Sequence, residues 1–457
     1  MGKAAATTAA ALYFDSGQFQ TELAAMVAHP TTSQVADAIG RLNIYPSDQI
    51  KPRLKAMGFD MAIHDNPDPS GGPFLTAIRI EDAHKPIVLI YGHGDVTHGQ
   101  SGAWANGMNP FDLTEDGDRL YGRGTADNKG QHLINIAALE AVLRTRGALG
   151  FNVKIVIEMS EEIGSPGLGA FFETHKELLS ADVLIASDGP RLQPDTPTIF
   201  MGSRGAIDFD LTVDLRNGAH HSGNWGGLLA DPAQILSHAI STICDARGQL
   251  QIEAWKPTSL TPAVRAALDG LPILSDAGPQ IDPEWGEASL TPTERAYAWN
   301  SFAVLAMNSG DIDAPQNAIN GIATARCQLR FVVGTNVDQI VPALRKHLCE
   351  NGFETVQVSE QMGGFQATRL DPNHPWVTRV AASITDTTGQ TPHILPNLAG
   401  SLPNACFTEI LGLPTVWIPH SYRGCSQHAP NEHVLKSTCR DALILMAGLW
   451  YDIGKTG

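Results

Sequence analysis

Histidine and carboxylate side chains, rather than cysteines, make up the polar clusters in which this sequence could do chemistry. The candidate ligands come from His93 or Asp95, Asp127, Glu161 or Glu162, Asp188 and His428. A nitrogen and oxygen donor set without thiolates suits zinc, manganese or cobalt better than a structural, cysteine-rich site. One carboxylate that bridges two cations would hold them roughly 3.5–4 Å apart, the spacing of two-metal hydrolases. The residue types therefore indicate hydrolysis at a pair of metal ions.

Two of these clusters hold a second polar residue beside the candidate ligand. In GHGD, His93 and Asp95 flank one glycine, so one can bind a metal while the other orients this ligand without contacting the metal itself. In EMSEEIG, Glu161 precedes Glu162, and adjacent side chains point apart. One carboxylate could then bind metal while its neighbour faces the reacting water, a division of labour that general-base metal hydrolysis requires.

Each cluster also has an ordinary structural explanation when it is taken alone. The pair in GHGD could be a hydrogen-bonded polar pair, and the two glutamates could complement the dipole of a solvated helix start. Asp127, in the glycine-rich YGRGTADNKG, could be the N-cap of a helix that begins near Lys129. A phosphate-binding loop does not fit this segment, because its glycines are spaced differently from those of that motif. On these residues alone, the metal and structural explanations both stay open.

Four short apolar runs end just before polar clusters and predict buried strands. They are PIVLIY (86–91), VKIVIE (153–158), DVLIAS (182–187) and PTVWI (414–418). Runs without alternation suit strands that are buried on both faces of a parallel sheet. A helix is predicted over 129–147, with Gly147 as its stop. Because ligands bind beyond the carboxyl ends of strands in open α/β sheets, the polar clusters are expected to converge on one site.

The middle of the chain alternates apolar and polar residues instead, which indicates strands with one solvated face. Alternating and helical segments follow one another at 206–216, 231–242, 323–333, 337–352 and 353–360. They predict a ferredoxin-like β-α-β-β-α-β layer. The stretch 246–306 contains prolines, glycines and three tryptophans and fits no element.

The predicted fold class is α/β, with a mostly parallel catalytic sheet and an inserted ferredoxin-like domain. A length of 457 residues also favours more than one domain. We expect a catalytic domain of residues 1–204 and 366–457, and an inserted domain of residues 205–365.

The bulk composition excludes several classes of function. A formal net charge of −17 at pH 7 repels nucleic-acid backbones and anionic lipid, so neither nucleic acid nor a membrane is an expected partner. The six cysteines form no CxxC pair, which indicates reduced thiols. The sequence has no run of about 18 apolar residues and no signal-peptide pattern. We therefore expect a cytoplasmic protein.

Six motifs, in this order, resemble those of a known enzyme family: GHGD, YGRGTADNKG, EMSEEIGSPGL, ASDG, HHSGNWGG and QHAPNE. The family is that of the dinuclear zinc carnosinases, dipeptidases, glutamate carboxypeptidase and acetylornithine deacetylase, and the resemblance runs from about residue 15 to the end. It implies that the inserted domain is a lid that also forms a homodimer. It also implies two zinc ions per subunit, with manganese or cobalt as alternatives.

The resemblance assigns each candidate ligand to a metal. It implies that Asp127 bridges both ions. His93 and Asp188 would complete the first site. Glu162 and His428 would complete the second.

Further roles follow from the same resemblance. Asp95 would support His93, and Glu161 would be the general base. His221, in HHSG, would reach the neighbouring subunit's site and steady the oxyanion, although His220 beside it could fill that position instead.

The substrate carboxylate also has implied partners. Arg330 matches the family arginine that binds it, and a guanidinium can grip a carboxylate through two hydrogen bonds. The loop of Gly400 and Ser401 resembles the turn that meets the same carboxylate, but Ala399 stands where the family has a glycine. As a structural alternative, Arg330 could be a surface residue of an alternating strand.

These features predict a hydrolase that cleaves a peptide or amide bond of a small substrate with a free carboxylate. In the resembling family, the Asp188 position tends to be aspartate in dipeptidases and aminopeptidases and glutamate in deacylases and carboxypeptidases, which favours a dipeptidase-like enzyme. An N-acyl- or carbamoyl-amino-acid amidohydrolase is the alternative. Two other classes are an inactive metal- or peptide-binding module and a serine or cysteine hydrolase based on Ser222 or Cys425, for which no GxSxG motif is present.

Overall fold

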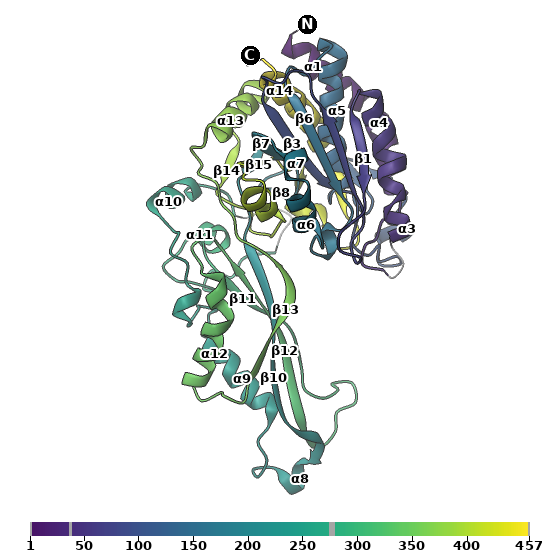
Figure 1. Ribbon diagram of the computed structural model, residues 1–457. Coiled ribbons are helices and arrows are strands. Elements are labelled where there is room, and N and C mark those ends of the chain that lie inside the picture. Colours follow the sequence, from purple (N-terminus) through teal and green to yellow (C-terminus); the bar gives the residue numbers. More distant parts are fainter. Residues whose placement is uncertain (1, 36–38, 274–278, 456–457) are drawn as a thin grey trace.

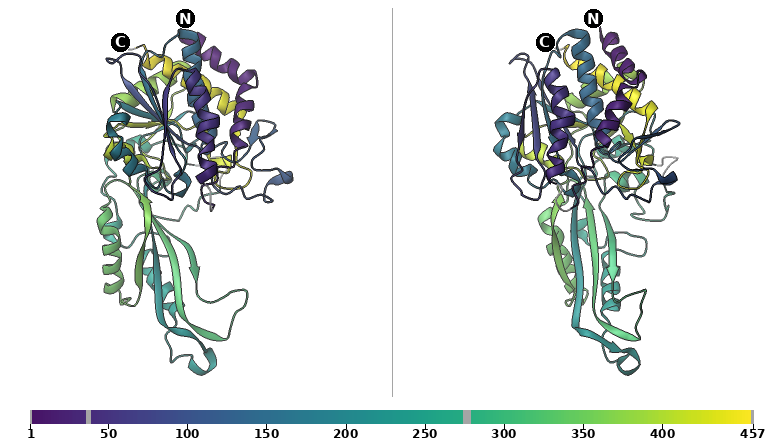
Figure 2. Two further views of the ribbon diagram at one scale, coloured as in Figure 1. Left: turned by 45° about the vertical axis from the view of Figure 1, so that its right-hand side comes forward. Right: turned by 90° about the vertical axis from the view of Figure 1, so that its right-hand side faces the viewer.

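Two sheets of unequal size organise the molecule in the computed structural model, which describes residues 2–35, 39–273 and 279–455 (Figure 1). The large sheet is covered by helices, and the small sheet extends away from it as a long arm (Figures 1 and 2). The first and last helices, α1 (Lys3–Asp15) and α14 (Lys436–Ile453), pack side by side at the end remote from the small sheet.

Eight strands form the large sheet in the order β1-β2-β6-β3-β7-β15-β9-β14. Their bounds are β1 (Asp60–His64), β2 (Phe74–Arg79), β3 (Ile87–His93), β6 (Asn152–Glu158), β7 (Val183–Ala186), β9 (Thr198–Phe200), β14 (His393–Leu395) and β15 (Thr415–Trp417). The neighbours β6, β3, β7 and β15 are parallel, whereas β1 and β2 are antiparallel at one edge. The four parallel strands are the four predicted from the apolar runs, so their carboxyl ends share one edge of the sheet.

Helices cover both faces of the large sheet. One face carries α1, α2 (Gln18–Val27), α5 (Lys129–Arg146), α13 (Pro375–Thr388) and α14. The other carries α6 (Leu168–Thr174), α7 (Lys176–Leu179) and the turn η6 (Cys406–Ile410).

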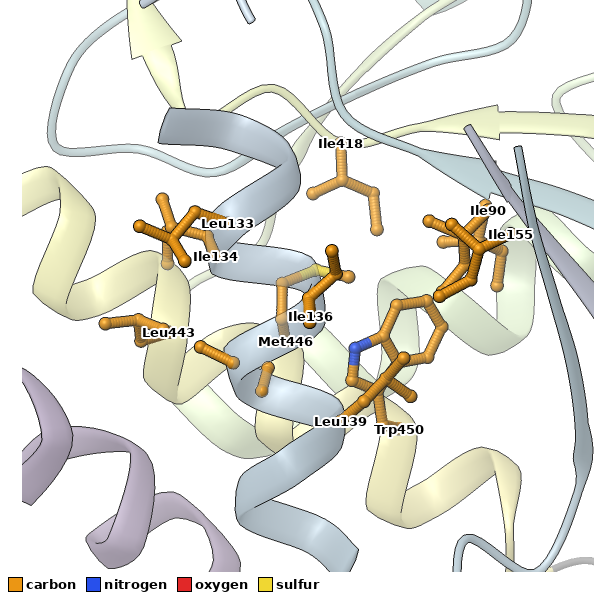
Figure 3. Close-up of a cluster of buried hydrophobic side chains, with 14 of the residues drawn as sticks. Ile90, Leu133, Ile134, Ile136, Leu139, Ile155, Ile418, Leu443, Met446 and Trp450 are labelled. Carbon is orange, nitrogen blue, oxygen red and sulfur yellow. The ribbon is translucent and has the colours of Figure 1, made fainter. Parts of the chain in front are cut away.

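Helix α5 lies at the centre of the first of these cores. Its Ile136 packs in one buried cluster with Ile90 and Ile155 of the sheet and with Met446 and Trp450 of α14 (Figure 3). The helix is buried on nearly all sides, including the polar residues Lys129, Gln131, His132 and Asn135 of its first two turns. The helix ends at Gly147, whose φ of 83° is in the left-handed region that favours glycine. The packing therefore fixes the start of α5 at Lys129, and its N-cap Asn128 follows Asp127 directly.

The small sheet is antiparallel, in the order β11-β12-β10-β13. Its strands and packed helices are β10 (Gly205–His221), β11 (Ser301–Asn308), β12 (Ala318–Phe331), β13 (Gln357–Phe365), α9 (Pro232–Ile243) and α12 (Ile340–Glu350). Along β10 the odd-numbered side chains, such as Phe209 and Leu211, are buried against the helices. Because side chains alternate along a strand, Asp208 and Asp210 lie on the open face.

The stretch 246–306 joins the two sheets. It contains η4 (Glu253–Trp255), α10 (Pro262–Leu268) and α11 (Pro292–Tyr297). Trp255 is buried in the core of the small sheet, while Leu268 and Tyr297 are buried in the core of the large one. Residues 274–278 of this stretch lie outside the described residues.

Short elements complete the chain. They are α3 (Ile39–Leu42), η1 (Pro46–Ile50), α4 (Lys51–Ala56), η2 (Ala105–Gly107), β4 (Thr114–Asp116), β5 (Arg119–Tyr121), η3 (Glu161–Ile163), β8 (Pro190–Arg191), α8 (Ser222–Trp225), η5 (Val337–Gln339), β16 (Ser421–Tyr422), η7 (Arg423–Cys425) and β17 (His433–Leu435). Among the described residues, no helix has the length and apolar character needed to cross a membrane.

The predicted fold class is confirmed, including the ferredoxin-like order of the small sheet. The alternating patterns underestimated two strands, since β10 continues to His221 and β12 begins at Ala318. Strand β11 was not located from the sequence. Its residues, SFAVLAMN, are mostly apolar yet largely exposed at the sheet edge, so they show no alternation.

Candidate metal centre and active site

The candidate ligands gather beside a cavity of about 840 Å³, whose walls come from both sheets. β3 ends at His93, and the turn after β6 carries Glu162. β7 leads to Asp188, and His428 lies in the loop after β16. Parallel neighbouring strands thus deliver these side chains to one edge of the sheet.

Asp127 lies between two imidazoles. Its Oδ1 is 2.9 Å from Nε2 of His93, and its Oδ2 is 3.0 Å from Nε2 of His428. The peptide bond between Asp127 and Asn128 is cis. The N-cap of α5 is Asn128, without a side-chain cap, so Asp127 does not serve as the helix N-cap considered above.

Two groups of potential metal ligands share Asp127. The first group is His93, Asp127 and Asp188, and the second is Asp127, Glu162 and His428, with the ligand atoms of each group within 4.8 Å of one another. Nε2 of His428 is 3.0 Å from Glu162 Oε2, and Nε2 of His93 is 3.6 Å from Asp188 Oδ2. The structure therefore brings all five candidate ligands together as two neighbouring sites joined by one carboxylate.

The electrostatics of this cluster favour a divalent cation. Burial, and then the charge of Asp127, raises the pKa of Glu162 and of Asp188 to about 7. Hydrogen bonds to Asp127 and Glu162 raise the pKa of His428 to about 11. Oδ2 of Asp188 is buried without a hydrogen-bond partner among the described residues. Crowded carboxylates and an orphaned ligand atom, together with nitrogen and oxygen donors, fit zinc or a similar ion.

Asp95 is buried behind the cluster and holds two parts of it. Its backbone carbonyl lies 3.1 Å from Nδ1 of His93, and its carboxylate Oδ1 lies 3.4 Å from the same atom. The two carboxylate oxygens accept the backbone N–H groups of Glu161 and Glu162, each at 3.1 Å. One side chain thus orients an imidazole and the turn that carries both glutamates.

Glu161 lines the cavity but belongs to neither ligand group. Burial raises the pKa of Glu161 well above its usual value, and the charge of Glu162 adds to this. A half-buried carboxylate with a raised pKa, placed next to candidate metal ligands, is suited to taking up and releasing a proton.

Glu432 is a supporting residue that the sequence analysis did not identify. It is fully buried, and its Oε1 accepts the backbone N–H groups of Gly124, Ala126 and Asp127 at 3.0–3.1 Å. Its Oε2 accepts a hydrogen bond from Arg123 at 2.6 Å. The loop of Asp127 is therefore fixed by a residue of the QHAPNE motif. The signal in the sequence was a pair of opposite charges, Arg123 in YGRGTADNKG and Glu432 in QHAPNE.

The other wall of the cavity carries the candidate substrate-binding residues. Arg330 of β12 donates a hydrogen bond to Oγ of Ser401 at 3.0 Å, and both residues line the cavity with Gly400. Ala399, which replaces the expected glycine, uses its backbone carbonyl to accept a hydrogen bond from Arg204 at 2.7 Å. Arg330 is therefore directed into the cavity from the open face of the small sheet, rather than lying on an outer surface.

His221 lies at the far end of β10, away from the large sheet (Figure 1). Its Nδ1 accepts the backbone N–H of Gly223, as the N-cap of α8. The hydroxyl of Ser222 donates a hydrogen bond to the backbone carbonyl of Asn317. Burial raises the pKa of the Cys425 thiol to about 12. Neither Ser222 nor Cys425 has the setting of a nucleophile. His221 is not among the described residues that line the cavity of its own chain.

The sequence was compared with protein families and curated proteins. The model of Peptidase family M20/M25/M40 matches residues 89–452. The chain is 28% identical to the cysteinylglycine-S-conjugate dipeptidase of Corynebacterium striatum over 367 residues, which cover 78% of this chain and 77% of the relative. It is 26% identical to the Beta-Ala-His dipeptidase of Homo sapiens over 418 residues, 87% of this chain and 81% of the relative.

Solved structures share the fold. The dipeptidase Dug1p of Saccharomyces cerevisiae matches with a TM-score of 0.82 over 100% of both chains, at 20% identity. The M20 family metallo-carboxypeptidase Sso-CP2 of Sulfolobus solfataricus matches with a TM-score of 0.81 at 24% identity, over 96% of this chain and 99% of that one. At these identities the structural matches establish the architecture alone.

Proposed function

The chain belongs to Peptidase family M20/M25/M40, and from this premise we propose that it is a metal-dependent dipeptidase whose substrates end in a free carboxylate. The observation that carries the proposal is the position of Asp127. One of its carboxylate oxygens lies 2.9 Å from His93 and the other 3.0 Å from His428, so a single side chain links two ligand groups.

Two zinc ions would be held by the residues of these groups, and manganese or cobalt could take the same donors. The proposed ligands are His93 and Asp188 for one ion, Glu162 and His428 for the other, and Asp127 for both. When bound, such a pair lowers the pKa of a water molecule to near 7 and polarises the carbonyl that is attacked.

Glu161 is the proposed general base. It would accept a proton from the attacking water and then deliver this proton to the nitrogen of the leaving amine. Asp95 supports this role, because it holds the backbone of Glu161 and Glu162 and so fixes the base relative to the neighbouring ligand. In a partner subunit, His221 would stabilise the negative charge that develops on the carbonyl oxygen.

Arg330 and Ser401 are proposed to bind the substrate's carboxylate. Both lie on the wall of the cavity that faces the ligand groups, and Gly400 leaves room beside them for a closely approaching ligand. A carboxylate held there would place the preceding peptide bond towards Asp127. This arrangement requires a small substrate with a free carboxyl end.

A dipeptide is the substrate class that we favour. The relatives from Corynebacterium striatum and Homo sapiens are both named as dipeptidases, and the ligand at position 188 is aspartate. An N-acyl- or carbamoyl-amino-acid would present the same carboxylate and the same amide, so an amidohydrolase is the second candidate.

We also propose that the protein is a homodimer and that it works in the reducing environment of the cytoplasm. The exposed position of His221 supports dimer formation, since the residue is not among the described residues that line the cavity of its own subunit. All six cysteines are free, which supports a reducing environment.

The direct test is hydrolysis of a panel of dipeptides and N-acyl amino acids by zinc-loaded protein. We expect dipeptides to be cleaved, activity to vanish with a chelator, and zinc to restore it. Cleavage of the N-acyl amino acids alone would replace the dipeptidase proposal by the amidohydrolase. Metal binding without any hydrolysis would favour the inactive module, and chelator-resistant hydrolysis would contradict the metal mechanism.

A further inference from the structure

Asp208 is a cavity carboxylate that the proposed chemistry does not use. Among the described residues that line the cavity, it is the only acidic one outside the ligands and Glu161. It lies on β10 directly opposite Gln328 of β12, and Gln328 donates a hydrogen bond from Nε2 to its Oδ1 at 2.9 Å. The pair thus forms part of the wall that the small sheet presents to the substrate.

Asp208 forms no salt bridge within the described chain, because no Lys, Arg or His nitrogen lies within 4.0 Å of its carboxylate. The charges of Arg330 and Arg326 act on it only from a longer distance. The next pair along the same face is different. Asp210 forms a two-hydrogen-bond ion pair with Arg326, at 2.9 and 3.0 Å. Because Gln328 is neutral, it fixes the orientation of Asp208 without compensating its charge.

The position of Asp208 relative to Arg330 follows from the strand register. Arg330 is paired with Ala206, and Gln328 with Asp208, so the two rungs are separated by two residues, roughly 7 Å along the strand. β10 starts beside the large sheet and runs away from it to His221 (Figure 1). Asp208 therefore lies beyond Arg330 when both are viewed from Asp127.

This order decides which part of a dipeptide meets Asp208. With the peptide bond at the ligand groups and the α-carboxylate on Arg330, the amino-terminal residue lies on the opposite side of the scissile bond. Only the side chain of the carboxyl-terminal residue can extend past Arg330. The bound α-carboxylate offsets the charge of Arg330, and Arg326 is paired with Asp210, which leaves Asp208 as the carboxylate of this wall without a salt bridge.

We infer that Asp208, oriented by Gln328, selects dipeptides whose carboxyl-terminal residue has a cationic side chain. The inference rests on the proposed function and deepens it by naming the substrate class. A lysine side chain is long enough to reach from a carboxylate bound at Arg330 to Asp208. Its ammonium would form a charge-assisted hydrogen bond with the Asp208 carboxylate. An acidic side chain would be repelled.

The test compares alanyl-lysine, alanyl-leucine and alanyl-glutamate, which differ only in the carboxyl-terminal side chain. For the zinc-loaded protein we expect kcat/KM to be highest for alanyl-lysine, by about tenfold over alanyl-glutamate. Asp208→Asn keeps the shape and the contact with Gln328, and should remove most of this preference. Asp210→Asn, which removes a carboxylate outside the cavity, is the matched control and should leave the preference unchanged.

Affinities for the same peptides, measured by calorimetry on zinc-loaded Glu161→Gln protein, separate this inference from the proposed function. Tighter binding of alanyl-lysine that depends on Asp208, but without hydrolysis by the unmodified protein, would support the inference and contradict the dipeptidase. Hydrolysis of all three peptides with a preference that Asp208→Asn does not alter would overturn the inference and leave the dipeptidase standing. If the protein neither binds nor hydrolyses these peptides, both the inference and the proposed function are overturned.

Discussion

Nε2 of His428 lies 3.0 Å from Oδ2 of Asp127, although 301 positions separate the two residues in the sequence. His428 has a φ of 58°, a left-handed conformation that is uncommon outside glycine, and its carbonyl accepts a hydrogen bond from Gln100 at 3.0 Å. Such a conformation persists only where the surrounding structure holds it, and it occurs often at functional sites. The second ligand group is therefore complete only once the last part of the chain has folded onto the first.

Replacing Glu161 by Gln should abolish turnover while the metal content stays normal. The amide keeps the size of the side chain but cannot accept a proton, so kcat should fall by about 10³-fold, within the usual range for loss of a general base. Metal analysis and dipeptide kinetics on the same preparation check this. A variant that keeps zinc and also keeps kcat would show that Glu161 is not the base.

Replacing Arg330 by Ala should weaken substrate binding more than catalysis. The guanidinium would contact the carboxylate in both the bound and the transition state, so KM should rise by roughly 10–100-fold with a smaller change in kcat. A dipeptide amide, which lacks the carboxylate, provides the control, because its hydrolysis should be slow and insensitive to the substitution. If Arg330→Ala slows hydrolysis of the dipeptide and of the dipeptide amide equally, Arg330 does not contact the substrate's carboxylate.

Mixing two inactive variants tests the cross-subunit role of His221. We expect His221→Ala and Glu161→Gln each to be nearly inactive as homodimers. In a mixed dimer, the subunit with an intact Glu161 receives His221 from its partner, so an equilibrated 1:1 mixture should recover about a quarter of the original activity. No recovery, despite mixed dimers visible by native mass spectrometry, would remove His221 from the site. The same mixing experiment with His220→Ala in place of His221→Ala shows which of the two histidines acts in the neighbouring subunit's site.

In the metal-free protein, His420 should contribute a loss of stability as the pH drops below about 6.5. Burial, and then the charge of Arg191, holds the pKa of His420 well below its usual value, and the ring is 2.9 Å from Oγ of Ser187. Below the ordinary histidine pKa the unfolded chain binds a proton here that the folded chain does not, so His420 contributes a loss of about 1.4 kcal/mol per pH unit.

Urea titrations between pH 6.5 and 5.0 measure this loss. His420→Asn should remove this contribution, so its free energy of unfolding should lose about 1.4 kcal/mol less per pH unit than that of the unmodified protein. Substitution of the exposed His238 is the matched control. An unchanged slope in His420→Asn would show that this imidazole is protonated in the folded protein.

The parts that the sequence predicted are those with a strong local signal. The apolar runs before GHGD and ASDG indicated buried parallel strands, and the rule that ligands lie beyond their carboxyl ends brought His93 and Asp188 together. Glu432 and Asp208 were missed because their importance depends on partners more than 100 positions away. Strand β11 was missed because its apolar residues are exposed at a sheet edge, where pattern and burial disagree.

The central claim is that Asp127 is shared by two metal ions, and anomalous X-ray scattering at the zinc edge from crystals of the zinc-loaded protein tests it most directly. We expect two peaks on either side of the Asp127 carboxylate, one against His93 and one against His428. A single peak, or peaks that Asp127 does not contact, would contradict the account.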